Sequence, residues 1–246
     1  MNGLFLALSF LTTLPVVPEG YRYEARHWRT AVIWFPIIGG LIGGVVWLVG
    51  WGSGLLFGEW LSAVLAVVVW AALTGGLHLD GLADCCDGLL ATAEPARRLE
   101  IMRDPRLGAF GVIGLALFLM LKVGAVQGAS AGGQPLAFVA AAAMGRSMIV
   151  WAARQPQARP GGMGAAFGEQ VRPFFLLLAT VLPVGLLLLL GWRGGLALLL
   201  AVLAVGGIMA LARKRIGGVT GDVYGLTVEM VELVVLLAFG VRGVIG

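Results

Sequence analysis

The sequence predicts an all-α integral membrane protein, a polytopic helical bundle with about seven transmembrane helices. Of its 246 residues, 59% are hydrophobic and only 12% are charged, and the mean hydropathy is +0.96. A soluble globule of this size needs more polar surface than this chain provides. The apolar residues also gather in runs that can cross roughly 30 Å of hydrocarbon. No linker divides the chain, so we expect residues 1–246 to form a single membrane-embedded domain.

A short apolar segment precedes the candidate spans. Pro15 ends the apolar segment formed by residues 2–16. The segment lacks the basic N-terminal region and the small-residue cleavage site of a signal peptide, so we expect an interfacial or re-entrant helix. The candidate spans are residues 31–50, 60–79, 107–127, 135–152, 174–191, 194–211 and 226–241.

The basic residues predict the topology. Most of the 17 Lys and Arg residues lie in four loops, at 20–30, 92–106, 153–172 and 212–218. With seven spans these loops share one side, which the positive-inside rule makes cytoplasmic. We therefore predict a multi-pass protein of the cytoplasmic (inner) membrane, in contact with membrane lipid and with its active site facing the cytoplasm. Because membrane topology explains the excess of Lys and Arg over Asp and Glu, the pI of about 9.6 gives no reason to expect nucleic acid as a partner.

Three acids follow the second candidate span. Asp80, Asp84 and Asp87 come after an uncharged run, and Gly75-Gly76 just before them predicts a helix break. On a continuous helix, the i, i+4, i+7 spacing places the three carboxylates within about 60° of one another. Carboxylates without a neighbouring His/Cys ligand set suit a hard cation, so we predict Mg²⁺ or Mn²⁺, shared with a phosphorylated substrate.

Two other side-chain types occur in the same stretch. His78 stands two residues before Asp80, on roughly the opposite helical face, so both a packing role and a substrate-binding role stay open for it. Cys85 and Cys86 are adjacent, and neighbouring Cα atoms are too close for usual disulfide geometry. We expect both cysteines to be small packing residues.

An Arg-rich loop follows. Arg103 and Arg106 flank Asp104, and Gly108 and Gly111 come directly after them. Guanidinium groups bind phosphate oxygens in bidentate fashion, and glycine lets backbone approach a ligand closely. The arrangement fits a metal and a diphosphate; a purely topological Arg cluster with a salt-bridged Asp is the alternative reading.

Two cations lie inside candidate spans. We expect Lys122 to extend its amine outward to the membrane interface. Arg146 lies about 9 Å from the cytoplasmic end of its span, and an intramembrane Arg that faces a cavity is a candidate for substrate binding. Extension of Arg146 to the interface stays open as well.

The last span begins with a phosphate-binding pattern. Gly218, Thr220 and Asp222 lie in a Gly-Gly-x-Thr-Gly-Asp segment that offers free backbone N–H groups, a hydroxyl and a carboxylate. If the helix starts by Asp222, then Glu229 and Glu232 share its face.

Together these segments resemble the cobalamin synthase family, the adenosylcobinamide-GDP ribazoletransferases. The resemblance is carried by residues 10–16, by His78 to Asp84 with Asp87-Gly88, by Glu100 to Asp104 with Arg106 to Gly108, and by Gly217-Gly218 with Thr220 to Asp222. It implies a Mg²⁺-dependent transferase in which α-ribazole, or its 5′-phosphate, attacks the diphosphate of adenosylcobinamide-GDP. GMP leaves, and adenosylcobalamin or its phosphate forms.

The residues and the resemblance together assign roles. We expect Asp80, Asp84, Asp87 and Asp222 to hold the metal. Asp87 is the first candidate for the general base and Glu229 the second. The substrate-binding candidates are His78, Arg103, Asp104, Arg106, Arg146, Gly218 and Thr220.

Two other function classes remain as alternatives. A CDP-alcohol phosphotransferase or an aromatic prenyltransferase also uses clustered aspartates on membrane helices, but the Arg-rich loop and the C-terminal Gly-Gly-x-Thr-Gly-Asp segment separate this chain from both. An ion-coupled secondary transporter would place its acids near the bilayer midplane, whereas most acids here lie at one edge. Assembly as a homo-oligomer is compatible with every reading.

Overall fold

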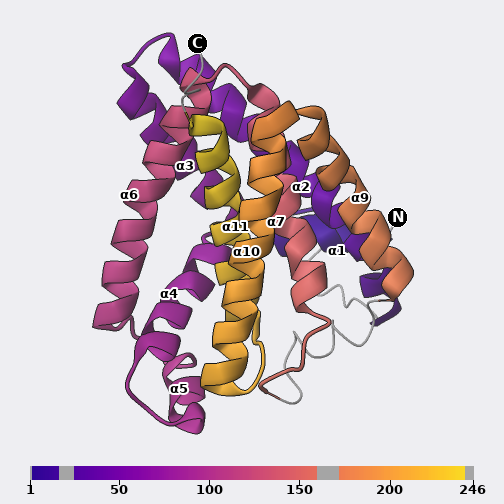
Figure 1. Ribbon diagram of the computed structural model, residues 1–246, viewed down its shortest axis with the longest axis vertical. Helices are drawn as coiled ribbons and strands as arrows, with labels where there is room; N and C mark the ends of the chain where they lie inside the picture. Colours follow the sequence, from indigo (N-terminus) through magenta and orange to yellow (C-terminus); the bar gives the residue numbers. More distant parts are fainter. Residues whose placement is uncertain (1, 17–24, 160–171, 242–246) are drawn as a thin grey trace.

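The computed structural model describes residues 2–16, 25–159 and 172–241, and within them the regular structure is α-helical (Figure 1). An isolated backbone bridge joins Gln157 to Val219. The helices are α1 (Asn2–Leu11), α2 (Ala25–Gly54), α3 (Glu59–Thr74), α4 (Leu77–Leu90), α5 (Pro95–Ile101), α6 (Ala109–Ala131), α7 (Pro135–Ala152), α9 (Pro173–Leu189), α10 (Gly191–Ile216) and α11 (Gly221–Gly240).

The predicted helical membrane bundle is confirmed, but among the helices that the structure describes, fewer than the seven predicted are long and apolar enough to span the membrane. In the described residues, α2, α6, α7, α10 and α11 are long and apolar enough to cross a membrane. Helices α3 and α4 pass the same test only as a bent pair, and α9 is apolar but has 17 residues. Five helices therefore qualify alone, or six spans when the bent pair counts as one.

The break between α3 and α4 occurs at the predicted glycine pair. Gly75 and Gly76 have φ of +62° and +68°, in the left-handed region that only glycine adopts without strain. Helix α4 leaves α3 at 93°. This bend points the acidic helix away from the axis of α3, toward the end of the molecule that holds α5 (Figure 1).

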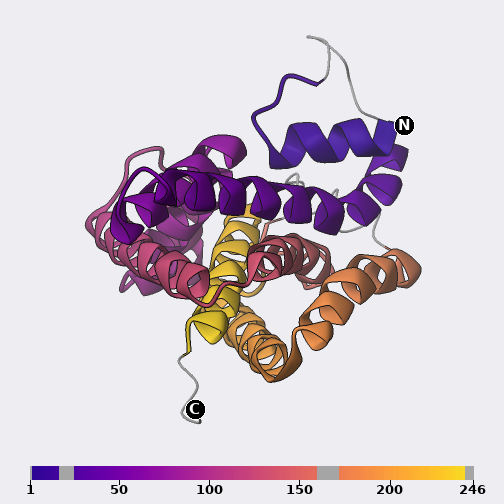
Figure 2. The same cartoon turned by 90° about the horizontal axis from the view of Figure 1, so that it is seen from above.

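Helices α7 and α11 form the inner part of the bundle. In their most apolar stretches, 78% and 72% of the residues are buried, against 28% in both α6 and α10. Figure 2 shows the outer helices arranged around this pair. Because α6 and α10 leave many apolar side chains exposed, their outer faces suit contact with lipid.

Helix α1 lies along the outside of α2 (Figure 2). Leu6, Ala7 and Leu11 are buried there. The segment that follows is fixed to the end of α3, because the amide of Thr13 donates to the carbonyl oxygen of Leu73 at 2.9 Å. The N-terminal segment thus borders the break that leads into α4.

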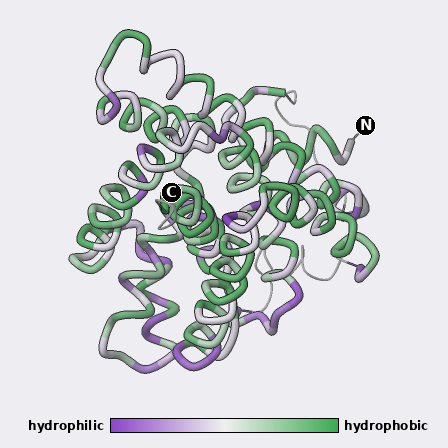
Figure 3. Tube along the Cα trace, turned by 45° about the horizontal axis from the view of Figure 1, so that its top comes forward, coloured by the Kyte–Doolittle hydropathy of each residue, from purple (hydrophilic) through white to green (hydrophobic). Residues whose placement is uncertain are grey.

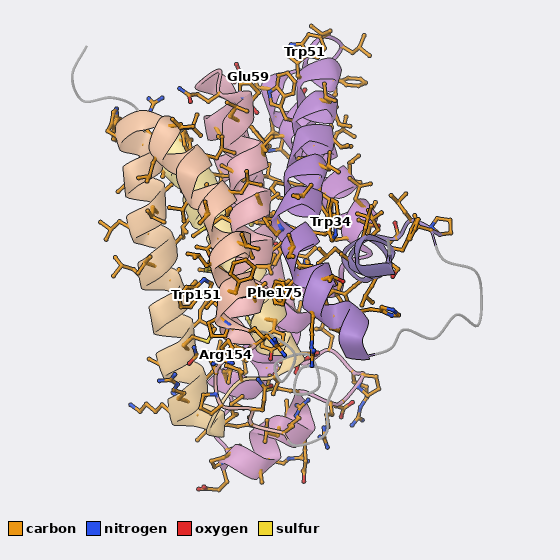
Figure 4. All side chains as sticks on the ribbon, turned by 90° about the vertical axis from the view of Figure 1, so that its right-hand side faces the viewer. Trp34, Trp51, Glu59, Trp151, Arg154 and Phe175 are labelled. Carbon is orange, nitrogen blue, oxygen red and sulfur yellow. The ribbon has the colours of Figure 1, made fainter. Side chains whose placement is uncertain are left out.

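The polar segments gather at one end of the molecule. Figure 3 shows the hydrophilic parts of the chain concentrated around α4 and α5, below mainly hydrophobic helices. Arg154 lies toward this end in Figure 4, whereas Trp51 and Glu59 mark the opposite end. Helix α10 ends and α11 begins at the polar end (Figure 1), which brings the C-terminal glycine-rich segment toward the acidic helix.

Candidate active site

Two glycines bring α4 and α11 into backbone contact. A Cβ atom at Gly81 would lie 2.8 Å from the carbonyl oxygen of Asp222, and a Cβ at Gly225 would lie 2.9 Å from that of His78. Side chains at either position would force the helices apart. The contact therefore places Asp222, at the start of α11, beside the acidic face of α4.

An open cleft of about 740 Å³ lies between α4 and the loop before α6. Its charged lining residues come from two remote motifs: Asp80 and Asp84 from α4, and Arg103, Asp104 and Arg106 from the loop. The charge of Asp84 also interacts with that of Asp222. The cleft thus combines carboxylates and guanidinium groups, as a metal-assisted reaction on a diphosphate requires.

Asp104 and Arg106 form a bidentate pair on the cleft wall. Arg106 Nη2 donates to Asp104 Oδ2 at 2.6 Å, and its Nε and backbone N donate to Oδ1 at 2.9 and 3.0 Å. These bonds lower the pKa of Asp104 to about 2. The salt bridge that the alternative reading gave to Asp104 is therefore present, and the exposed Arg103 and Arg106 both face the cleft.

Asp87 occupies a different position from Asp80 and Asp84. Its Oδ2 accepts from the amide of Gly108 at 2.7 Å, and its Oδ1 accepts from that of Gly111 at 2.8 Å. Asp87 is buried and does not line the cleft. Both oxygens satisfy free N–H groups at the start of α6, where a negative charge is favourable. This position favours an anchoring role for Asp87 over the predicted roles of metal ligand and base.

The C-terminal segment orients Asp222. Thr220 caps α11, and its hydroxyl donates to Asp222 Oδ2 at 3.1 Å. Arg159 Nη1 lies 3.6 Å from the same oxygen. Gly218 contacts backbone directly, since a Cβ there would lie 2.8 Å from the amide nitrogen of Ala158. The glycine at 218 thus allows the loops to meet and is not among the residues that line the cleft.

Four charged side chains meet inside the bundle, and they correct the expectation for Lys122. Lys122 is only 2% exposed and pairs with Glu229 and with Glu232, so the expectation that it extends to the interface is wrong. Arg146 is 0% exposed and pairs with Glu232. Neither Arg146 nor Glu229 lines the cleft. Burial and mutual pairing favour a structural role over the predicted substrate-binding role of Arg146 and catalytic role of Glu229.

A smaller pocket of about 170 Å³ lies on the other side of Asp80, which lines both cavities. His78 and Asp222 line it together with Phe10, Trp28 and Tyr224. His78 is buried, with 3% of its surface exposed. The structure thus places His78 in a pocket wall and not only in helix packing.

The comparison with protein families identifies the family of the chain. The family model described as cobalamin-5-phosphate synthase matches residues 3–240, nearly the whole chain. The chain belongs to the cobalamin-5-phosphate synthase family.

Relatives in this family match over most or nearly all of their length. An adenosylcobinamide-GDP ribazoletransferase of a Roseiflexus species is 40% identical, over 94% of this chain and 86% of its own. Those of Stutzerimonas stutzeri and Escherichia coli are 38% and 36% identical, over 98% and 97% of this chain and 99% of their own chains. No solved structure matches the chain.

The cleft of this cobalamin-5-phosphate synthase family member has the donors for a hard cation. Among the described residues, no three His, Cys, Asp or Glu side chains converge as a complete ligand set. Mg²⁺ needs no such set, because it keeps several waters and binds through one or two carboxylates plus substrate phosphates. Asp80 and Asp84 in the cleft, with Asp222 beside them, fit that mode of binding.

Several residues of this family member's site carry no recognisable signal of that position in the sequence. Arg159 appears only as one of many loop cations, yet it links Asp222 to the carbonyl oxygen of Leu99, to which its Nη2 donates at 2.8 Å. Phe10 belongs to a family motif, and Trp28 lies in a predicted polar loop, but neither pattern shows that these residues line the same pocket. The site positions of Arg159, Phe10 and Trp28 follow from contacts between segments that are far apart in the sequence, which the sequence alone does not show.

Proposed function

We propose that this protein is an adenosylcobinamide-GDP ribazoletransferase, which joins adenosylcobinamide-GDP to α-ribazole or α-ribazole 5′-phosphate. The product is adenosylcobalamin or its 5′-phosphate, and GMP is released. The full-length relatives carry this name. The observation that carries the proposal is the single cleft in which the acids of α4 face the Arg-rich loop, next to Asp222.

The reaction we propose is a phosphoryl transfer. The 5′-hydroxyl oxygen of α-ribazole bonds to the phosphorus next to the cobinamide, the bond from that phosphorus to the GMP oxygen breaks, and GMP leaves with the bonding electrons. Arg103 and Arg106 bind the diphosphate oxygens. The hydroxyl proton passes to a carboxylate that lines the cleft. Asp87 and Glu229 do not line the cleft, so neither is the base in this proposal.

A divalent cation belongs to this proposal. Asp80, Asp84 and Asp222 would hold Mg²⁺, which when bound neutralises charge on the diphosphate. Asp104 keeps Arg106 directed along the cleft wall, through three hydrogen bonds. Thr220 and Arg159 orient Asp222. The protein thus contributes position and charge, which supply most of the catalysis in phosphoryl transfer.

We also propose the orientation in the cytoplasmic membrane. The cleft lies at the polar end, where the described parts of the basic loops gather (Figures 3 and 4). The positive-inside rule places such an end in the cytoplasm. Labelling of single cysteines introduced near Arg97 and near Trp192, in intact cells, tests this orientation: only the second should react with an impermeant reagent.

The enzymatic proposal is tested with purified protein in detergent. We expect GMP release that requires both substrates and Mg²⁺ and that stops on addition of a chelator. Absence of GMP release under these conditions would reject the proposal. Substrate accumulation in proteoliposomes without GMP release would support the secondary-transporter alternative instead.

A further inference from the structure

The small pocket beside the cleft has the features of a site for one flat aromatic group. It lies between α1, α2, α4, α7 and α11, and its walls include the rings of Phe10, Trp28 and Tyr224. Phe10 and Trp28 pack edge to face, with 5.3 Å between ring centroids. The pocket volume is about 170 Å³. For comparison, an apolar protein cavity of about 150 Å³ holds benzene.

His78 gives this pocket an unused polar group. Neither ring nitrogen of His78 has a hydrogen-bond partner within the described part of the chain, although the residue is only 3% exposed. Buried polar groups in proteins are nearly always hydrogen-bonded, so one left over in a pocket wall indicates a partner from a ligand. A neutral imidazole offers one N–H donor and one acceptor nitrogen.

From these observations we propose that the pocket binds the base of the acceptor nucleoside, a benzimidazole-type bicycle attached to ribose. This inference rests on the proposed function and assigns one of its two substrates to a place. The base lies against the aromatic side chains that line the pocket, and the N–H of His78 donates to its one free ring nitrogen. The other ring nitrogen carries the ribose.

The same pocket suits guanine, the other base in the reaction, less well. Guanine presents several donors and acceptors along its edges, and each needs a polar partner when buried. Apart from His78, and from Asp80 where the pocket meets the cleft, the polar groups of Tyr224 and Asp222 are already engaged: Tyr224 pairs with Gln157, and Asp222 with Thr220 and Arg159. A base with a single free ring nitrogen matches the one N–H donor of a neutral His78.

The position of the pocket fits the transfer. Asp80 and Leu77 line both the pocket and the cleft, so the two cavities meet at the first turn of α4. A nucleoside with its base in the pocket would direct its ribose toward Asp80. The 5′-hydroxyl then points to the diphosphate that Arg103 and Arg106 bind.

Two variants test the assignment by equilibrium binding of α-ribazole to the purified full-length protein. His78→Phe keeps the ring and removes the donor, and Trp28→Leu removes one wall. We expect each to weaken α-ribazole binding about tenfold, while KM for adenosylcobinamide-GDP changes less than about twofold. Trp192→Leu is the matched control, because Trp192 is exposed and lies outside the pocket.

The results of these experiments distinguish binding of the α-ribazole base in the pocket from binding of guanine there. Unchanged α-ribazole binding in both variants would overturn the proposal. If, in addition, KM for adenosylcobinamide-GDP rose, that result would place guanine in the pocket. If one variant does not fold in detergent, the other still decides. Wild-type protein that binds α-ribazole but releases no GMP would refute the transferase function and leave the pocket assignment intact.

Discussion

Lys122 Nζ lies 2.7 Å from Glu232 Oε2, a contact that joins α6 to α11 inside the bundle. Glu229 and Arg146 complete a buried group of two cations and two anions. Lys122 also lies over the ring of Trp70, 4.4 Å from its centroid. Because an unpaired buried ion is far more costly than a balanced set, these residues depend on one another.

Removal of one cation should therefore destabilise the bundle. We expect Lys122→Met to lower the free energy of unfolding by roughly 3–5 kcal/mol, since it leaves a buried carboxylate without its partner. Thermal unfolding in detergent measures the effect. Lys214→Met, at an exposed position of α10, is the matched control and should change little.

Charge balance gives the decisive comparison for this group. The double variant Lys122→Met/Glu229→Gln removes one charge of each sign, so it should be more stable than Lys122→Met alone. A double variant that is no more stable than the single one would show that the size of Lys122, and not its charge, stabilises the bundle.

Asp84→Asn should abolish GMP release. The change keeps the size of the side chain and removes the cleft charge, and we expect a loss on the order of 100-fold or more with an unchanged unfolding temperature. Glu94→Gln changes an exposed carboxylate outside the cleft and should behave as wild type. Near-normal turnover of Asp84→Asn would remove the metal role from this residue.

Gly81→Ala should separate the two acidic motifs. Its new Cβ would meet the carbonyl oxygen of Asp222, so α4 and α11 must shift apart. Misplacement of about 1 Å can cost about 100-fold in rate, and we expect a loss of this order. Gly124→Ala introduces the same group into open space on α6 and should leave activity intact. Equal rates for the two variants would show that the close helix contact is not needed.

Asp87→Asn distinguishes an anchor from a base. An amide has one acceptor oxygen, so one of the two bonds to Gly108 and Gly111 is lost. We expect a stability loss of roughly 1–3 kcal/mol and a higher KM for adenosylcobinamide-GDP, because the Arg-rich loop directly precedes Gly108. Complete loss of turnover in a fully folded protein, with KM unchanged, would restore Asp87 as the base.

Several features follow from short-range properties of the chain, and the sequence was sufficient for them. Apolar runs of spanning length predict membrane helices, and the pair Gly75-Gly76 predicts a break because only glycine adopts left-handed φ without strain. The Asp104 pairing was one of two predicted readings, since Arg106 lies two residues away. The family followed from motifs that are themselves local strings of residues.

Tertiary structure alone decided the partners of the charged residues. The spacing of Asp80, Asp84 and Asp87 on one helix does not show that the first two face a cleft while the third anchors α6. Likewise, Lys122 looks like an interfacial residue until α11 supplies Glu229 and Glu232. The physical reason is that a helix period places a side chain on a face, whereas only packing determines which remote segment covers that face.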